Sequence, residues 1–185
     1  MTNFVHQQFL KDLSLCDRII EAHKNSPYKG AGHVLSQGEL CIRQDLKDST
    51  DCWLDGDLMA EYAVELQGVV DEYIKKYPAC NMYAPWTVVE QINIQLYKPN
   101  GGYKAWHTER GSIAPQAAAR HLVFMTYLND VTDEGGTEFM NQKLVVNAEK
   151  GKTLIWPADW THTHRGVVSP TQDKYIVTGW FSFTK

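Results

Sequence analysis

Two short segments of the chain carry side chains that can bind a metal ion. The first is His107-Thr108-Glu109, in which an imidazole and a carboxylate lie two residues apart. On an extended backbone, side chains at this spacing point to the same face, with Cα atoms about 7 Å apart, so both can reach one ion. Alone the pattern is weak, because a surface pair of histidine and glutamate often arises by chance.

The second segment is His162-Thr163-His164, which lies shortly before Lys174. One more imidazole would complete a set of two histidines and one carboxylate. Such a set binds Fe(II) on one face and leaves three coordination positions open, whereas a structural zinc site fills all four. This pair is also weak on its own, because a histidine beside Trp160 is more often a packed core residue.

The elements that must position these segments change character near residue 88. Before it, a helix is predicted to follow Ser14-Leu15-Cys16-Asp17, which resembles a capping box. A second helix is predicted over Asp57–Lys76, where apolar residues form one stripe. The segment Ser26–Gln37 is rich in Gly, Ser, Pro and Tyr, which is typical of a loop. We therefore expect a helical part over about residues 1–87.

The part after residue 88 is predicted to form strands. Apolar and polar side chains alternate over Val88–Tyr97, which places Gln91, Asn93, Gln95 and Tyr97 on one face. Helices followed by short strands predict one mainly β (α+β) domain over residues 1–185, with the helices packed on one sheet of a jelly roll. Further strands are predicted at Arg120–Leu128, Leu144–Asn147, Thr153–Trp156 and Lys174–Phe183.

Composition fits a single globular domain and argues against several functions. With 185 residues, 43% apolar and 22% charged, the chain is long enough to bury about two-thirds of its unfolded surface. The net charge of −4 and the lack of a run rich in Lys and Arg disfavour nucleic-acid binding. No apolar run approaches the ~20 residues of a membrane span, and no secretory leader is evident. We expect a cytoplasmic protein whose four cysteines are free thiols.

The two metal-binding segments belong to a longer ordered pattern, which covers most of residues 88–183. In order and spacing, this pattern resembles the prolyl-4-hydroxylase-type branch of the Fe(II)- and 2-oxoglutarate-dependent oxygenases. The resemblance implies a double-stranded β-helix, which is a jelly roll, around an Fe(II) site. It rests on His107-x-Glu109, Tyr127-Leu128-Asn129, Gly135-Gly136-Thr137-Glu138-Phe139, Lys150-Gly151, His164-Arg165-Gly166 and Lys174.

The resemblance assigns His107, Glu109 and His164 to the metal. His164 is preferred to His162 because it precedes Arg165-Gly166 and lies ten residues before Lys174, as the distal ligand of the family does. Glu109 departs from the usual aspartate by one methylene, so the iron or the backbone must shift slightly. It still supplies a carboxylate, which favours hydroxylation over halogenation.

The co-substrate residues follow from the same resemblance and from charge. The C5 carboxylate of 2-oxoglutarate ends deep in the barrel, where a buried carboxylate needs a counter-charge and hydrogen bonds. Lys174 gives the charge, Thr178 on the same strand face gives a hydroxyl, and Tyr127 gives a phenol. Tyr97 fits the family position near the C1 carboxylate.

The implied reaction is hydroxylation of a C–H bond with release of succinate and CO₂, with ascorbate as the reductant in assays. The implied substrate is a prolyl-type peptide or protein, with Arg110, Arg165 and Trp180 as substrate-side candidates. The segments Arg110–Arg120 and Ser26–Gln37 are candidate lids. Three alternatives stay open: a free amino acid or small metabolite as substrate, a non-catalytic metal-binding jelly roll, and nucleic-acid dealkylation. The oligomeric state does not follow from the sequence.

Overall fold

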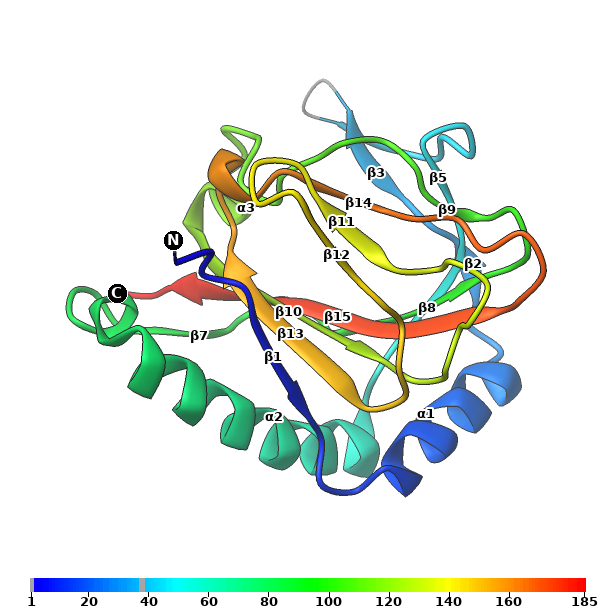
Figure 1. The fold of residues 1–185 in the computed structure, drawn as a ribbon, viewed down its shortest axis with the longest axis horizontal. Coiled ribbons are helices and arrows are strands. Elements are labelled where there is room, and N and C mark those ends of the chain that lie inside the picture. The colour runs from blue at the N-terminus through cyan, green and yellow to red at the C-terminus, as the bar shows by residue number, and fades with distance from the viewer. Residues whose placement is uncertain (1, 37–38) are drawn as a thin grey trace.

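The computed structural model describes residues 2–36 and 39–185, and its centre is an eight-stranded sheet (Figure 1). The strands are β1 His6–Phe9, β2 Gly30–Ala31, β6 Thr50–Trp53, β7 Trp86–Val88, β8 Asn93–Tyr97, β10 Arg120–Tyr127, β13 Lys152–Pro157 and β15 Lys174–Phe183. They lie in the order β1-β13-β10-β15-β8-β6-β2, and β7 pairs with the C-terminal end of β15. The long strand β15 is therefore central to the sheet.

Smaller sheets complete the β structure. The first is three-stranded, and its buried side chains pack against one face of the large sheet. These facing sheets form the jelly roll that the sequence predicts. The three-stranded sheet contains β12 Leu144–Val146, β11 Thr137–Phe139 and β14 His164–Gly166, in that order. The two-stranded sheets pair β3 Val34–Ser36 with β4 Glu39–Cys41, and β5 Lys47–Asp48 with β9 Gly102–Tyr103.

Helices cover the opposite face of the large sheet (Figure 1). The two long ones are α1 Ser14–Asn25 and α2 Gly56–Lys76, and their apolar stripes bury Ile19, Tyr62 and Leu66 in the same core as sheet residues of β10 and β15. Both helices lie where the sequence predicts them. The short helices are α3 Pro115–Ala119 and the 3₁₀ turns η1 Pro78–Asn81 and η2 Trp160–His162.

The alternation of side chains along β15 divides the interior into two layers. Tyr175 and Val177 face the helices, whereas Ile176 and Trp180 face the small sheet. Gly179 leaves room for the ring of Phe124 on β10, since a Cβ atom there would overlap the ring. One face of β15 is thus committed to the core, and the other can line a cavity.

Several predicted elements differ in detail. The strand expected over Val88–Tyr97 is split into β7 and β8, because residues 89–92 leave the sheet and Glu90 turns to pair with Arg120. The capping box is wrong: α1 begins at Ser14, and the Ser14 hydroxyl donates to Asp12 instead of capping the helix.

The N-terminal part is also less purely helical than expected. Strands β1 and β6 join the large sheet, and the predicted loop Ser26–Gln37 contains β2 and β3, while Gln37 lies outside the described residues. The four cysteines are free thiols, as predicted. Within the described chain, no helix is long and apolar enough to cross a membrane.

Candidate metal centre and co-substrate pocket

Two histidines are brought together by direct backbone pairing. His164 opens β14, and His107 lies on the loop that follows β9. Each backbone N–H donates to the carbonyl oxygen of the other residue, at 3.0 Å in both directions. This antiparallel bridge fixes the separation of the two imidazoles, whose ring centroids lie 4.3 Å apart.

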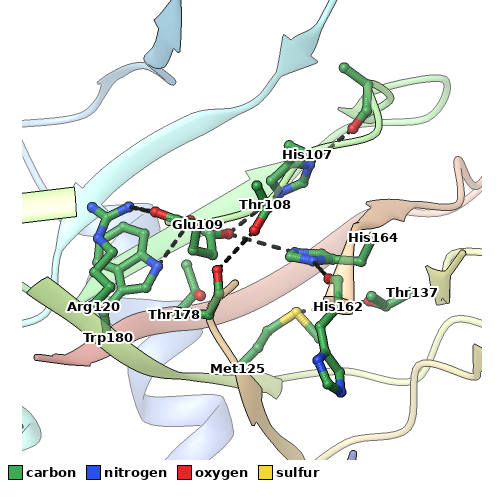
Figure 2. A network of polar contacts seen from close by, with 12 residues as sticks. His107, Thr108, Glu109, Arg120, Met125, Thr137, His162, His164, Thr178 and Trp180 are labelled. Carbon is green, nitrogen blue, oxygen red and sulfur yellow. Dashed lines mark hydrogen bonds and ion pairs between the residues drawn. The ribbon is translucent and has the colours of Figure 1, made fainter. Parts of the chain in front are cut away.

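The carboxylate of Glu109 completes the group. Its Oε1 lies 3.4 Å from Nε2 of His107 and 3.6 Å from Nε2 of His164, and the three side chains point toward one another (Figure 2). Metal–ligand bonds of about 2.0–2.2 Å place neighbouring ligand atoms roughly 3 Å apart. A small contraction therefore brings all three atoms onto one ion, so the residues present fit a metal.

Both imidazoles are oriented with Nε2 toward Glu109. Nδ1 of His107 lies 2.9 Å from the carbonyl oxygen of Ala105, and Nδ1 of His164 lies 2.9 Å from that of His162. A carbonyl partner makes Nδ1 the protonated nitrogen and leaves Nε2 free to bind metal. The Tyr103 ring stacks on His107, with centroids 3.6 Å apart and planes at 7°.

The second carboxylate oxygen of Glu109 is held from the other side. Its Oε2 accepts a hydrogen bond from the Trp180 indole at 3.0 Å and lies 3.4 Å from the Arg120 guanidinium. Arg120 stacks 3.5 Å from the Trp180 ring and pairs with Glu90 at 2.6 Å. These contacts hold Oε2, so that the longer side chain of Glu109 places Oε1 toward the two histidines.

Electrostatics at the centre favour the protonation states that bind metal. Burial alone would raise the pKa of Glu109, but the hydrogen bonds and charges of His107 and His164 hold that pKa well below its usual range. Burial, together with the charge of His107, lowers the pKa of His164. Both shifts favour the forms that bind a metal ion, which are the carboxylate of Glu109 and the neutral imidazole of His164.

The Trp180–Glu109 hydrogen bond yields a testable prediction. In Trp180→Phe, the ring that supports Arg120 stays while the indole donor is lost, so Fe(II) affinity should fall about 10–100-fold, as is typical for an outer-sphere partner. Calorimetric titration of the metal-free protein measures this change.

Trp86→Phe is the matched control, because its indole also donates one hydrogen bond, to the Cys80 carbonyl oxygen at 3.1 Å, and the residue lies outside the cavity. It makes the same change of ring and loses a hydrogen bond away from the metal centre, and the metal affinity should stay within the same order of magnitude. Equal affinity in Trp180→Phe and the parent protein would show that the indole does not position Glu109.

The metal centre opens into a cavity of about 1250 Å³ between the large sheet and the loops. The polar face of β8 lines this cavity, as does the alternate face of β15. Alternation of polar and apolar side chains is typical of a strand with one exposed face. In β8 the polar face lines the cavity instead. These lining residues are Asn93, Gln95, Tyr97, Lys174, Ile176, Thr178 and Trp180.

Lys174 is a buried cation at one end of this cavity. The residue is 4% exposed, and within the described part of the chain its ammonium donates to two carbonyl oxygens, those of Gly135 at 3.0 Å and Val167 at 3.3 Å. No carboxylate among residues 2–36 and 39–185 pairs with it. Burial lowers the pKa of Lys174 to about 8. A buried ammonium without an anion requires a counter-charge, and a ligand carboxylate would supply one.

Hydroxyl groups lie close to Lys174. The Tyr127 hydroxyl and Thr137 Oγ1 are 2.6 Å apart, and Thr137 follows two residues after Gly135, whose carbonyl accepts from Lys174. Burial raises the pKa of Tyr127, so the phenol stays protonated. Tyr97 pairs with Lys174 across the strands, and its ring lies 5.1 Å from the ammonium.

The position of Thr178 corrects one expectation. Four residues on a strand span roughly 13 Å, so Thr178 cannot meet a carboxylate that sits on Lys174. Its hydroxyl donates to the Phe124 carbonyl oxygen at 3.1 Å. Thr178 lines the middle of the cavity instead.

Two of the three substrate-side candidates lie away from the cavity. Arg165 follows His164 on β14 and so points to the opposite face, where it pairs with Glu138 at 2.8 Å. Arg110 donates to the Ala118 carbonyl oxygen at 3.0 Å within its own loop. Only Trp180 lines the cavity, and its indole contacts Glu109.

His162 does not share the face of His164. A spacing of two residues would place both histidines on one face of a strand, but His162 ends the 3₁₀ turn η2 and only His164 lies on β14. The ring of His162 points away from the metal centre (Figure 2), with Nε2 2.9 Å from the carbonyl oxygen of Asn3. His162 contributes through its backbone carbonyl, which orients His164.

Both candidate lid segments border the cavity. Tyr28, Gly30 and Val34 line it from the first segment, and Ser112 and Gln116 line it from the second. Placement at the rim is what a lid requires, and closure over a ligand stays a prediction.

Sequence reasoning did not nominate Glu90, Arg120 or Thr137. Glu90 and Arg120 carry no spacing signal, because the fold alone brings Glu90 to Arg120 and Arg120 to Glu109. Thr137 had a signal, since it directly follows Gly135-Gly136 in the quoted pattern.

Comparison with known proteins adds a family match and a fold match. The model of the "2OG-Fe(II) oxygenase superfamily" matches residues 92–182, which span the metal centre and Lys174. No curated protein matches the chain.

Three solved structures are similar over nearly the whole chain. A prolyl-4-hydroxylase from Pseudomonas putida is 15% identical, with a TM-score of 0.72 over 100% of this chain and 95% of that one. A viral collagen prolyl hydroxylase from Paramecium Bursaria Chlorella virus-1, in its 2-oxoglutarate complex, is 17% identical, with a TM-score of 0.69 over 98% and 97%. A Trichoplax adhaerens prolyl hydroxylase bound to a peptide fragment of the hypoxia inducible factor oxygen degradation domain is 18% identical, with a TM-score of 0.73 over 98% and 84%.

Proposed function

Since the chain belongs to the 2OG-Fe(II) oxygenase superfamily through residues 92–182, we propose that it hydroxylates a C–H bond of a prolyl-type peptide. One observation carries the proposal: the two histidines and the carboxylate share a cavity with a buried lysine that has no acidic partner among the residues that the structure describes. The histidines and the carboxylate can bind a cation, and Lys174 can bind an anion. Fe(II) and 2-oxoglutarate are a cation and an anion that bind together in this family.

Fe(II) and 2-oxoglutarate, when bound, supply the oxidation: O₂ and 2-oxoglutarate are consumed, succinate and CO₂ are released, and a substrate C–H becomes C–OH. The chain binds and orients. His107, Glu109 and His164 hold the metal on one face and leave the remaining positions open. Lys174 binds the C5 carboxylate, and Trp180 keeps Glu109 in place beside the substrate space.

Support for a peptide substrate comes from the mouth of the cavity. Tyr28, Leu40, Trp53 and Val89 line the cavity and are between 51% and 85% exposed. Exposed apolar side chains around a groove are typical of a surface that binds another chain. The Trichoplax adhaerens structure holds a peptide on the same fold.

The deciding experiment is a succinate-release assay with Fe(II), 2-oxoglutarate and ascorbate, run against prolyl peptides and a panel of free amino acids. We expect a prolyl peptide to stimulate release and to gain one oxygen atom by mass. Stimulation by a free amino acid alone would favour the metabolite hydroxylase. No release under any condition would leave a metal-binding module without turnover.

The pKa of Lys174 predicts how co-substrate binding depends on pH. The folded value of about 8 lies below the usual 10.5, so the unfolded chain holds more protons between these values. The ligand-free fold is therefore destabilised by about 3 kcal/mol near neutral pH, and stability is regained as pH rises from about 8 toward 10.5.

Binding of 2-oxoglutarate has the opposite dependence, because it needs the charged ammonium. Its affinity should change little between pH 6.5 and 7.5 and fall about tenfold per unit above pH 8. Calorimetry of the metal-loaded protein under anaerobic conditions measures this. An affinity that is flat up to pH 9.5 would contradict the role of Lys174.

A further inference from the structure

A strip of polar side chains lies on the cavity wall beside the metal centre. It contains Lys47 of β5, Asp51 of β6, and Asn93 and Gln95 of β8, and all four line the cavity. Asp51 pairs with Gln95 across the strands, so their side chains project from the same face of the large sheet. We call these four residues the polar strip.

An ion pair forms one end of the polar strip. The Lys47 side chain is 5% exposed; its ammonium donates to Asp51 Oδ2 at 2.6 Å, and the Ser49 hydroxyl donates to Oδ1 at 2.7 Å. Gly32 lies over the pair, because a Cβ atom there would come within 2.9 Å of the Lys47 ammonium. The chain thus makes room for a charged pair inside the cavity.

The strip holds hydrogen-bonding groups without partners in the described chain. Lys47 has three protons and one acceptor, Asp51. The Gln95 carboxamide oxygen accepts from Tyr97 at 2.7 Å, and its amide nitrogen has no acceptor among residues 2–36 and 39–185. The Asn93 side chain has no hydrogen-bond partner in the same ranges. The wall therefore offers both donors and acceptors to a ligand.

Stability does not explain this arrangement. A buried ion pair contributes little more than apolar packing of the same volume, because both charges lose their hydration. The buried Gln95 amide nitrogen, which has no acceptor among the described residues, adds a further cost unless something binds it. The strip is explained when a ligand supplies matching donors and acceptors.

We propose that the polar strip binds main-chain amide groups of the peptide substrate. The bound amides belong to the peptide residues that precede and follow the residue placed at the metal. This inference rests on the proposed function. Lys47 and the Gln95 amide donate to peptide carbonyls, Asp51 accepts a peptide N–H, and the Asn93 carboxamide does both. Recognition is of the backbone, so it extends along the peptide and does not depend on its side chains.

The charge of the strip and the size of the cavity select this ligand. Lys47 and Asp51 cancel, so the strip suits a neutral, dipolar group. A cavity of about 1250 Å³ exceeds the roughly 300–1,000 Å³ typical of pockets for small ligands. The ends of a bound, extended peptide can pass out of the cavity at its mouth, beside Trp53 and Val89. A free amino acid would fill only a small part of the space.

The test is a length series in the succinate-release assay. The probes are blocked prolinamide, the blocked tripeptide Ala-Pro-Ala and the blocked pentapeptide with two alanines on each side, with free proline alongside. In the parent protein, KM should fall with each added pair of residues. A KM that does not change with length, stimulation by free proline alone, or no stimulation by any probe overturns the proposal.

Two variants locate the effect on the strip. Lys47→Asp/Asp51→Lys keeps an ion pair but reverses its polarity, and Asn93→Leu removes the amide while keeping the branched shape of the side chain. Each should raise the KM of the pentapeptide about tenfold or more, with a smaller change in kcat. The matched control is Arg43→Asp/Asp45→Arg, which reverses an exposed ion pair at 2.6 Å outside the cavity. Its KM should fall with peptide length as in the parent protein.

The same assay separates the two levels of failure. Succinate released without peptide reports the metal and co-substrate chemistry alone. If the parent protein releases no succinate either with or without peptide, the proposed function fails. If release is present while both variants retain the KM of the parent at every length, only the role of the polar strip fails.

Discussion

Alanine in place of His164 is expected to abolish Fe(II) binding and 2-oxoglutarate turnover. The change removes one of three ligand atoms, and the remaining pair, His107 and Glu109, cannot hold the ion on one face. The loss should exceed the roughly 10–100-fold cost of removing an outer-sphere partner. Succinate release and calorimetric metal titration measure the two effects separately.

His162→Ala is the matched control, since it truncates a buried histidine two residues away. The ring of His162 contacts Thr161 and the Asn3 carbonyl, while its backbone carbonyl, which orients His164, is retained. The variant should keep its metal and most of its turnover. A dead His162→Ala beside an iron-loaded His164→Ala would mean that the assigned ligand is wrong by two positions.

Alanine in place of Lys174 should leave metal binding nearly intact and weaken 2-oxoglutarate binding. A charge-assisted hydrogen bond is worth about 1.5–3 kcal/mol, which is about ten- to over a hundredfold in affinity. Calorimetry with 2-oxoglutarate on the metal-loaded protein measures the change. The ligand-free variant should also be more stable than the parent near pH 7, because an unpaired buried charge is removed.

The control for Lys174 is another buried lysine. Lys152 is 8% exposed and pairs with Glu149, outside the cavity. Lys152→Ala should lose stability, because it removes the ion pair with Glu149. It should keep its affinity for 2-oxoglutarate. Unchanged affinity in Lys174→Ala would place the C5 carboxylate elsewhere in the cavity.

The parts of the site that follow from local pattern were predictable from the sequence. A spacing of two residues brought His107 and Glu109 to one face, and the resemblance to the oxygenase family, through the offset of His164 from Lys174, separated His164 from His162. The long strand β15 and helix α2 also lie where periodicity placed them. In each case the signal is carried by neighbours in the chain.

What the sequence did not reveal depends on contacts between distant segments. Arg120 and Trp180 meet at Glu109 because β10 and β15 are adjacent, and no spacing encodes this. Arg165 was misplaced because strand alternation was not applied to it after His164. Thr178 was assigned to the co-substrate by face alone, although distance along the strand separates it from Lys174. The polar strip depends on β5, β6 and β8 coming together around one cavity.

The most direct test of the account is an anaerobic titration of the metal-free protein with Fe(II) and then 2-oxoglutarate, followed by visible absorption. Chelation of the ion by the 2-oxo acid gives a charge-transfer band that neither component gives alone. We predict one such band per protein molecule, retained in His162→Ala and absent in His164→Ala. A band that survives in His164→Ala, or 2-oxoglutarate binding that does not require the metal, would contradict the assignment of His107, Glu109 and His164 as the iron site.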